Sequence, residues 1–374
     1  MKIAIEAQRI FRTKKHGMDF VVLETIKQLQ KIDLVNEYYI IAAPGKDRSV
    51  LLESSNFYII EINCPTYPLW EQFALPMAIK RIKPDILHCT SNTAPLICSV
   101  PLIITLHDII FLEKRDVRSK SLYQNLGWYY RKLVVPRILK KCRLIITVSE
   151  FEKRIIQQKL NLTDIVVSEY NGYGSHFKVI EDVQPVLNNY LKQTEYLFFL
   201  GNTDPKKNTL RVLKAYAIYI KKVKNPRKLV IADLTEEDIK RIVQNNEIDS
   251  QVLSNIITIG YISNKDLPYI YNAAYLFLYP SLRESFGIPQ LEAMACGTPV
   301  ITSNISAMPE ISGDAAIYTN PYDEGSIAEA IVRMEDVTLH REYVMRGLKR
   351  VVFFSWENTA IQIHNHYNSM QDVK

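Results

Sequence analysis

Two glutamates eight residues apart, Glu284 and Glu292, are the side chains of this sequence whose type and spacing best suit ligand chemistry. Glu284 lies in a Gly-containing loop after an apolar run that ends at Pro280, and Glu292 lies about a turn into a helix expected from about Pro289. Such a helix start offers backbone N–H groups and a positive dipole end to a phosphate. A carboxylate beside a diol accepts two hydrogen bonds, so one Glu suits a ribose and the other a sugar ring. Two solvated helix-end acids explain the spacing equally well.

Other polar residues follow apolar runs elsewhere in the chain. Lys206 and Lys207 stand in "PKKN" after the run "EYLFFLGN", and His107 and Asp108 end the run "LIITLHD". Taken alone, the lysine pair is typical of a solvated turn, and a single His after an apolar strand is more often structural than catalytic.

The elements that must position these residues follow one pattern, in which short Ile-, Val-, Leu- and Tyr-rich runs alternate with segments of helical spacing. This pattern predicts an α/β protein with parallel sheets covered by helices on both faces. Strands are expected at "KIAIEA", "YYIIAA", "FYIIEI", "ILHCTS", "LIITLHD" and "LIITVSE", and again at "EYLFFLGN", "KLVIAD", "NIITIGY", "YLFLYPS", "PVITSN" and "AAIYT". The pattern restarts after a polar connection, which predicts two doubly wound domains with ligands at the carboxyl ends of their strands.

Composition narrows the class of protein. The chain has 374 residues, 47% hydrophobic and 23% charged, which is enough for two cores and excludes a disordered chain. A net charge of +6 is mild for this length, so nucleic-acid binding is not indicated. Five cysteines without C-x-x-C spacing favour reduced thiols in a cytosolic protein. No run approaches the ~18 apolar residues of a membrane span.

Several motifs together resemble glycosyltransferase family 4, whose members are retaining enzymes of GT-B fold. The resemblance rests on the Glu284–Glu292 spacing with "SFG" and "EAMACGTPVI", on "MPEISGDAA", and on "FFLGNTDPKKNTLRVLKAY", "LIITVSEFEKRII" and "EYNGYGSHF". It covers nearly the whole chain. It implies two Rossmann-like domains facing a central cleft: an acceptor-binding domain at 1–185, a nucleotide-sugar-binding domain at 186–352, and a terminal helix at 353–374 that crosses back to the first domain.

The resemblance also assigns donor-binding residues. Glu292 would bind the ribose and Glu284 the hexose hydroxyls, while Lys207, helped by Lys206, would neutralise the diphosphate. A fixed cation there would stabilise the leaving group in the transition state. Backbone N–H groups and close approach of the chain would come from the remaining donor positions, Gly201, Phe286, Gly287, Ile288 and Gly17. The family's usual Arg is absent, because Asn202 and Lys206 occupy its positions, and Lys does not reproduce a bidentate contact.

In the first domain, His107 resembles a cleft histidine near the reacting hexose, with Asp108 beside it. Ser149 matches another cleft position. Asp19 replaces the second Gly of the phosphate loop, and we expect it to cap the following helix because a carboxylate would repel a diphosphate. The family's favoured mechanism is front-face departure of the diphosphate, so no general base is assigned. No Asp-x-Asp motif or zinc-like His spacing is present, so neither metal nor cofactor is expected.

Residues 118–143 are basic and aromatic, with no acidic residue between Asp116 and Glu150. This mixture suits an anionic membrane surface or a polyprenyl-diphosphate-linked acceptor. A helix with inward aromatic and solvated basic side chains is the other interpretation. The expected location is cytoplasmic, with peripheral association on the inner face of the membrane.

The "GNTDPKKN" loop resembles the mannosyltransferase-like subset, which favours GDP-mannose as donor and a glycan or lipid-linked oligosaccharide acceptor in surface polysaccharide synthesis. UDP-hexoses and dTDP-rhamnose are alternative donors. A sugar-nucleotide epimerase or a phosphorylase of GT-B fold is less well supported. A catalytically silent nucleotide-sugar-binding subunit is the alternative from another class, since Asn202, Lys206 and Asp19 depart from the family pattern.

Overall fold

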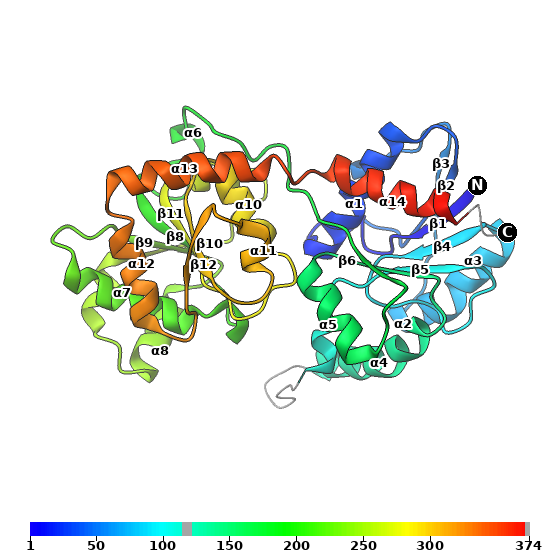
Figure 1. Cartoon of the computed structure of the whole chain (residues 1–374), viewed down its shortest axis with the longest axis horizontal. Coiled ribbons are helices and arrows are strands. Elements are labelled where there is room, and N and C mark those ends of the chain that lie inside the picture. The colour runs from blue at the N-terminus through cyan, green and yellow to red at the C-terminus, as the bar shows by residue number, and fades with distance from the viewer. Residues whose placement is uncertain (114–121, 371–374) are drawn as a thin grey trace. The chain divides into compact units, whose positions relative to one another are not determined.

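The computed structural model describes residues 1–113 and 122–370, and these residues form two compact units (Figure 1). Unit 1 consists of Met1–Gly172 and Ser355–Lys374, and unit 2 consists of Tyr173–Phe354. The terminal helix therefore belongs to unit 1. Among the described residues, no helix has the length and apolar character needed to cross a bilayer.

Unit 1 is built on a seven-stranded parallel sheet of order β3-β2-β1-β4-β5-β6-β7. Its strands are β1 Lys2–Glu6, β2 Glu37–Ala42, β3 Phe57–Glu61, β4 Ile86–Cys89, β5 Leu102–Thr105, β6 Leu144–Thr147 and β7 Val166–Ser168. The first six were predicted. The edge strand β7 was not, because three residues carry too little pattern to stand out.

Helices cover both faces of this sheet (Figure 1). Alternate residues of β1 point to opposite sides, so Ile3 and Ile5 join one core with α1 and α14, while Ala4 joins the other core. The helices are α1 Gly17–Ile32, α2 Tyr67–Leu69, the π-helix η2 Trp70–Ala74, α3 Leu75–Ile82, α4 Leu122–Leu139, α5 Glu150–Leu160 and α14 Trp356–Ser369, with the 3₁₀ turns η1 Arg48–Val50 and η3 Ile110–Leu112.

Unit 2 is built on a six-stranded parallel sheet of order β10-β9-β8-β11-β12-β13. Its strands are β8 Tyr196–Leu200, β9 Leu229–Ala232, β10 Ile256–Gly260, β11 Ala274–Tyr279, β12 Val300–Ser303 and β13 Ala316–Thr319, all six as predicted. The helices are α6 Gln184–Leu187, α7 Thr209–Lys222, α8 Glu236–Asn245, α9 Leu267–Ala273, α10 Ile288–Ala295, α11 Met308–Ser312, α12 Glu324–Arg333 and α13 Val337–Val351, with the 3₁₀ turns η4 Pro205–Lys207 and η5 Ser250–Asn255.

The strand order reverses once in each sheet, between β1 and β4 in unit 1 and between β8 and β11 in unit 2. Ligands of doubly wound sheets bind at the carboxyl ends of the strands beside such a reversal. The loops that follow these four strands are therefore the places to look for function.

The connection between the units begins earlier than the sequence analysis placed it. Residues 173–185, assigned there to the first domain, belong to unit 2. The side chain of Asn272 explains why, because its amide donates to the carbonyl of Lys178 at 2.9 Å and its oxygen accepts from the N–H of Ile180 at 2.8 Å. These contacts are long-range and leave no trace in local sequence pattern.

Candidate nucleotide-sugar site and acceptor-side residues

The loop after β8 is shaped by two residues that tolerate little change. A Cβ on Gly201 would lie 2.8 Å from the carbonyl oxygen of Ala232, so only glycine fits this turn. Asn208 adopts a left-handed conformation (φ 65°), is buried, and donates its amide to the carbonyls of Pro280 at 2.9 Å and Pro321 at 2.7 Å. This loop is thereby fastened to the loop that follows β11.

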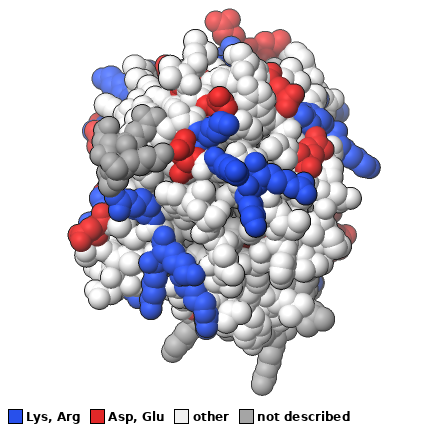
Figure 2. Space-filling model, turned by 90° about the vertical axis from the view of Figure 1, so that its right-hand side faces the viewer, with Lys and Arg blue, Asp and Glu red and all other residues white. Residues whose placement is uncertain are grey.

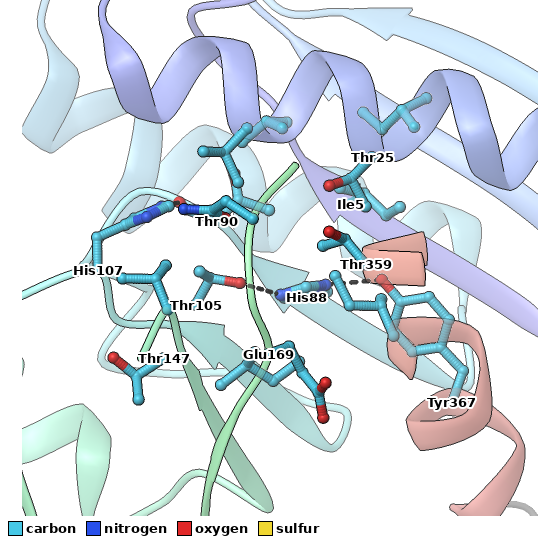
Figure 3. A pocket seen from close by; sticks show the side chains of 17 residues that line it. Ile5, Thr25, His88, Thr90, Thr105, His107, Thr147, Glu169, Thr359 and Tyr367 are labelled. Carbon is cyan, nitrogen blue, oxygen red and sulfur yellow. Dashed lines mark hydrogen bonds between the residues drawn. The ribbon is translucent and has the colours of Figure 1, made fainter. Parts of the chain in front are cut away.

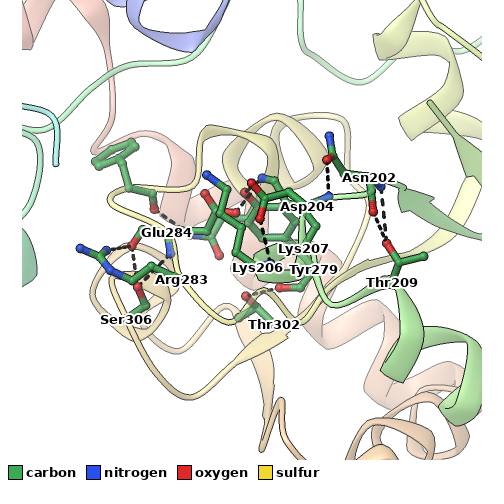
Figure 4. Close-up of polar contacts among 12 residues, drawn as sticks. Asn202, Asp204, Lys206, Lys207, Thr209, Tyr279, Arg283, Glu284, Thr302 and Ser306 are labelled. Carbon is green, nitrogen blue, oxygen red and sulfur yellow. Dashed lines mark hydrogen bonds and ion pairs between the residues drawn. The ribbon is translucent and has the colours of Figure 1, made fainter. Parts of the chain in front are cut away.

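The fastening brings Lys207 and Glu284 together (Figure 4). Lys207 Nζ lies 2.7 Å from Glu284 Oε1, and the two side chains are only 24% and 14% exposed. Tyr279 completes the group, since its hydroxyl lies 3.5 Å from the same Nζ. Burial and the nearby Glu284 carboxylate raise the pKa of Tyr279, which therefore keeps its proton. The sequence analysis named Lys207 and Glu284, but Tyr279 stood unnoticed at the end of its strand.

The backbone around Glu284 is held by Ser306, another residue without a sequence signal. The Glu284 N–H donates to Ser306 Oγ at 2.9 Å, and the same hydroxyl donates to the Glu284 carbonyl at 2.6 Å (Figure 4). Ser306 itself has a positive φ of 65°. The carboxylate is therefore presented from a fixed backbone.

The N-terminus of α10 lies directly after the loop that carries Glu284. Gly287 caps the helix with φ 96°, and Pro289 lies in its first turn. Among the described residues, the N–H groups of Gly287 and Ile288 have no hydrogen-bond acceptor. The Phe286 ring is buried against Phe354, with ring centroids 6.0 Å apart, so its side chain belongs to the core.

Glu292 lies one turn into α10 and is half-buried. Its carboxylate makes no hydrogen bond or ion pair with any residue of the described ranges. Burial raises its pKa to about 8. A carboxylate that is removed from water and has no partner is well suited to accept hydrogen bonds from a ligand.

Lys206 and Asn202 have mainly local contacts. The Lys206 N–H donates to Asp204 Oδ1 at 3.1 Å, and its carbonyl accepts from the Leu282 N–H at 2.7 Å. Asn202 Oδ1 accepts from the Asp204 N–H at 2.8 Å (Figure 4). The backbone of Lys206 therefore ties the two loops together, while its half-buried side chain makes no ion pair with a described residue.

In unit 1, His107 follows β5 and is 6% exposed. Its backbone N–H donates to Asn92 Oδ1 at 2.6 Å, and its ring Nε2 lies 3.0 Å from the carbonyl oxygen of Thr90. Burial lowers the pKa of His107, so the ring is neutral near pH 7. Since a carbonyl only accepts, Nε2 carries the proton, and Nδ1 is left as an acceptor.

Three further predicted positions serve as local caps. Asp108 Oδ1 accepts from the Ile110 N–H at 3.0 Å, and Ser149 Oγ accepts from the Glu152 N–H at 3.1 Å at the start of α5. Asp19 Oδ2 accepts from the His16 N–H at 2.9 Å, which confirms the expected capping role. Gly17 begins α1 and is exposed, and a Cβ there would meet no atom within 4 Å, so packing does not require glycine.

A small cavity of about 30 Å³ lies inside unit 1 between the sheet, α1 and α14 (Figure 3). His88 crosses it, with Nδ1 at 2.6 Å from the Tyr367 hydroxyl and Nε2 at 2.8 Å from Thr105 Oγ1. The hydroxyls of Thr25 and Thr147 also line it and are buried without a partner. Its size suits water and is too small for a sugar. Through these two hydrogen bonds, His88 of β4 joins the terminal helix α14 to the sheet.

No group of three or more His, Cys, Asp or Glu residues within 1–113 and 122–370 is arranged to hold a metal ion. Metal independence and the absence of a cofactor stay predictions. Of the basic and aromatic segment 118–143, residues 118–121 and the side chains of 122–124 lie outside the described residues.

Comparison with known proteins agrees with this architecture. Residues 16–172 match the family model described as Glycosyltransferase Family 4, and residues 184–349 match the one described as Glycosyl transferases group 1. The O-antigen chain mannosyltransferase B of Escherichia coli is 30% identical over 273 residues, which cover 71% of this chain and 69% of that protein. The serotype-specific mannosyltransferase WbdA of Escherichia coli is 28% identical over 311 residues, covering 77% of this chain but 37% of WbdA, so the chain spans little more than a third of that relative.

Among solved structures, the sucrose-phosphate synthase of Thermosynechococcus elongatus superposes with a TM-score of 0.75 at 19% identity, over 100% of both chains. Two doubly wound α/β units of this kind define the GT-B fold. The chain belongs to glycosyltransferase family 4.

Proposed function

We propose that this glycosyltransferase transfers mannose from GDP-mannose, with retention of configuration and without a metal ion, to a glycan or lipid-linked oligosaccharide in surface polysaccharide synthesis. The observation that carries the donor site is the gathering of Lys207, Glu284 and Glu292 at the switch point of unit 2. Support for mannose comes from the two mannosyltransferase relatives.

In the proposed site, Glu292 accepts hydrogen bonds from the ribose, since its carboxylate is half-buried and unpartnered. The N–H groups of Gly287 and Ile288 donate to the diphosphate at the positive end of α10. Lys207 exchanges part of its contact with Glu284 for the phosphate oxygens, and Glu284 then accepts from hexose hydroxyls. Donor binding is thus an exchange of partners within a preformed ion pair.

The proposed reaction breaks the bond between the sugar's anomeric carbon and the diphosphate oxygen and forms a bond from that carbon to an acceptor hydroxyl oxygen on the same face. The hydroxyl proton passes to the departing diphosphate. Lys207 stabilises the charge that grows on the leaving group. The neutral His107, whose Nδ1 is an acceptor, is proposed to receive a hydrogen bond from a sugar hydroxyl. Asp108 caps the turn that directly follows His107, and Ser149 caps α5 after the neighbouring strand β6.

The donor is tested by thermal stabilisation against GDP-mannose, UDP-glucose, UDP-N-acetylglucosamine, UDP-galactose and dTDP-rhamnose, with EDTA and then with Mg²⁺. A selective shift with GDP-mannose in EDTA, followed by GDP release, supports the proposal. A selective shift with another donor replaces GDP-mannose. A shift with a donor that is not followed by nucleotide release favours the catalytically silent nucleotide-sugar-binding subunit. No shift with any donor or free diphosphate contradicts the proposed donor site.

We further propose that the outer face of α4 contacts an anionic membrane surface. This α4 surface consists of exposed apolar side chains, Leu126, Tyr129 and Leu133, and exposed basic side chains, Arg131, Lys132, Arg137, Lys140, Lys141 and Arg143. In Figure 2, the Lys and Arg side chains in the lower half of the view stand among white ones with few acidic neighbours, whereas basic and acidic side chains are interspersed in the upper half.

Apolar side chains with basic neighbours match the headgroup region of an anionic bilayer. If the apolar side chains of this helix only packed inward, Leu126, Tyr129 and Leu133 would not be more than half exposed. Trp128 and Tyr130, by contrast, are half-buried and pack inward as the alternative interpretation requires. The proposed partner surface therefore rests on part of the segment only.

A further inference from the structure

Arg9, at the switch point of unit 1, is a cation without an ion-pair or hydrogen-bond partner for its side chain in the described part of the chain. It follows β1, and the loop after β4 lies beside it in the strand order. Arg9 is half-buried and forms no side-chain hydrogen bond or ion pair with any residue of 1–113 or 122–370. Its Nε is buried and unsatisfied. A guanidinium carries five donors. The buried Nε–H lacks an acceptor, which is costly, while the two terminal amino groups reach the surface and are available to a ligand.

The position of Arg9 is fixed by an aromatic ring. Its Cζ lies 5.1 Å from the ring centroid of Tyr67. The Tyr67 hydroxyl donates to Glu71 Oε1 at 2.7 Å and lies 2.7 Å from Thr93 Oγ1, so the ring is held by the loop that follows β4. The guanidinium is therefore preorganised on a platform and retains its hydrogen-bonding edge.

The two buried carboxylates nearby do not take up this edge. Glu71 accepts from Tyr67, Thr93, Tyr130 and Gln72, which are all neutral donors. Glu6 accepts from the N–H of Gln8 at 3.0 Å and the N–H of Thr90 at 3.1 Å.

Arg9 lies on the same edge of the sheet as His107. The loop after β4 contacts His107 through Asn92 and Thr90, and it contacts the Tyr67 platform through its next residue, Thr93. One loop of four residues thus links Arg9 to the histidine that we place beside the reacting sugar.

We propose that Arg9 binds a phosphate oxyanion of the acceptor. This inference rests on the proposed transfer to a lipid-linked oligosaccharide, whose lipid we expect to be joined through a diphosphate. The fork of a guanidinium matches two phosphate oxygens, which the single ammonium of lysine does not. The group recognised is a phosphate ester or diphosphate, whether free or attached to a lipid.

The test is a calorimetric titration of full-length protein that carries Lys207→Met, so that the proposed donor diphosphate site does not compete. The probes are farnesyl diphosphate, inorganic pyrophosphate and phosphate-free farnesol. Adding Arg9→Met is expected to weaken diphosphate binding at least tenfold and to leave farnesol binding unchanged. Arg9→Lys, which keeps the charge and loses the fork, is expected to fall between.

Arg48 supplies the matched control, because its Cζ lies over the Phe11 ring at 4.7 Å but its Nε is paired with Glu61 at 2.6 Å. Arg48→Met is expected to change diphosphate affinity less than twofold. If farnesyl diphosphate and pyrophosphate both bind and both lose affinity in Arg9→Met, the protein recognises the phosphate groups alone. If farnesyl diphosphate binds and pyrophosphate does not, it recognises the lipid-linked form.

Equal diphosphate affinity with and without Arg9 overturns the proposal, as does the absence of any diphosphate binding. Melting temperatures of the variants exclude misfolding, and Arg9→Lys keeps the test valid if Arg9→Met is unstable. Failure of GDP-mannose to stabilise the unmodified protein would instead overturn the proposed donor, because the titration contains no nucleotide.

Discussion

Replacing Glu292 with glutamine is expected to make the protein more stable near neutral pH. Burial raises the pKa of Glu292 from 4.5 to about 8. The folded state therefore binds this proton more tightly than the unfolded chain, and the free energy of unfolding falls as pH rises from 4.5 to about 8. At pH 7 the cost has an upper limit of about 3 kcal/mol, at about 1.4 kcal/mol per pH unit.

Glu292→Gln removes the ionisation and loses no described hydrogen bond of the carboxylate. For a unit of this size, recovery of that energy corresponds to a melting temperature higher by roughly 2–4 °C per kcal/mol. The gain is expected at pH 7–8 and is expected to vanish near pH 4.5. Thermal unfolding followed by circular dichroism across this pH range measures it.

The same substitution is expected to weaken donor binding. Hydrogen bonds from ribose hydroxyls to a carboxylate contribute about 1.5–3 kcal/mol, which is roughly 12- to 150-fold in affinity. Because binding selects the ionised carboxylate, donor affinity of the unmodified protein should rise by up to about tenfold per pH unit below pH 8 and then level off. Glu292→Gln should flatten this pH dependence.

The control is Glu342→Gln on α13, where the carboxylate is 47% exposed and pairs with Arg346 one turn away. An exposed pair of this kind contributes little, so its stability should change by less than about 1 kcal/mol at any pH. If Glu292→Gln gives no gain in stability at pH 8, the Glu292 carboxylate is not buried without a partner as described. A gain in stability with unchanged donor affinity would refute its role in binding.

Three further predictions follow from single contacts. Lys207→Met should lower turnover by about 10²–10³-fold and donor affinity less, because its charge acts mainly on the leaving group; equal losses in kcat and affinity, measured by initial rates and calorimetry, would place its effect in the ground state. Asn208→Ala should lower the free energy of unfolding by about 1–3 kcal/mol in urea, because it loses two hydrogen bonds to carbonyls and leaves alanine at a strained positive φ. Asn208→Gly should lower it by less, because glycine tolerates that φ. Equal losses for the two variants would contradict the backbone contribution. Flotation with anionic vesicles should be lost for Leu133→Glu and reduced for Arg137→Glu, and binding to anionic vesicles that is insensitive to salt would contradict the electrostatic part of the α4 surface.

Most of the fold can be read from the sequence because buried parallel strands are continuous apolar runs. Twelve strands were predicted in this way, and all twelve occur. The short edge strand β7 lacks such a run. The boundary at Gly172 escaped prediction because it depends on Asn272, about a hundred residues from the chain that it holds.

The residues of the candidate site also fall into those that the sequence predicted and those that only the structure revealed. Glu284, Glu292 and Lys207 could be named from spacing and family resemblance, since each stands within a short motif of neighbouring residues. Tyr279 and Ser306 could not, because a Tyr at a strand end and a Ser in a loop are unremarkable until folding places them against Lys207 and Glu284.

The residue types and their order along the chain already indicate a two-domain glycosyltransferase of GT-B fold and its donor motifs. Only the tertiary structure decides which charges are compensated. Lys207 is paired with Glu284, whereas the side chains of Glu292 and Arg9 form no ion pair or hydrogen bond with a described residue. Pairing and burial depend on contacts between residues far apart in sequence, such as Lys207 with Glu284 and Arg9 with Tyr67, and these contacts exist only after the parallel strands have brought their carboxyl ends to one edge of each sheet.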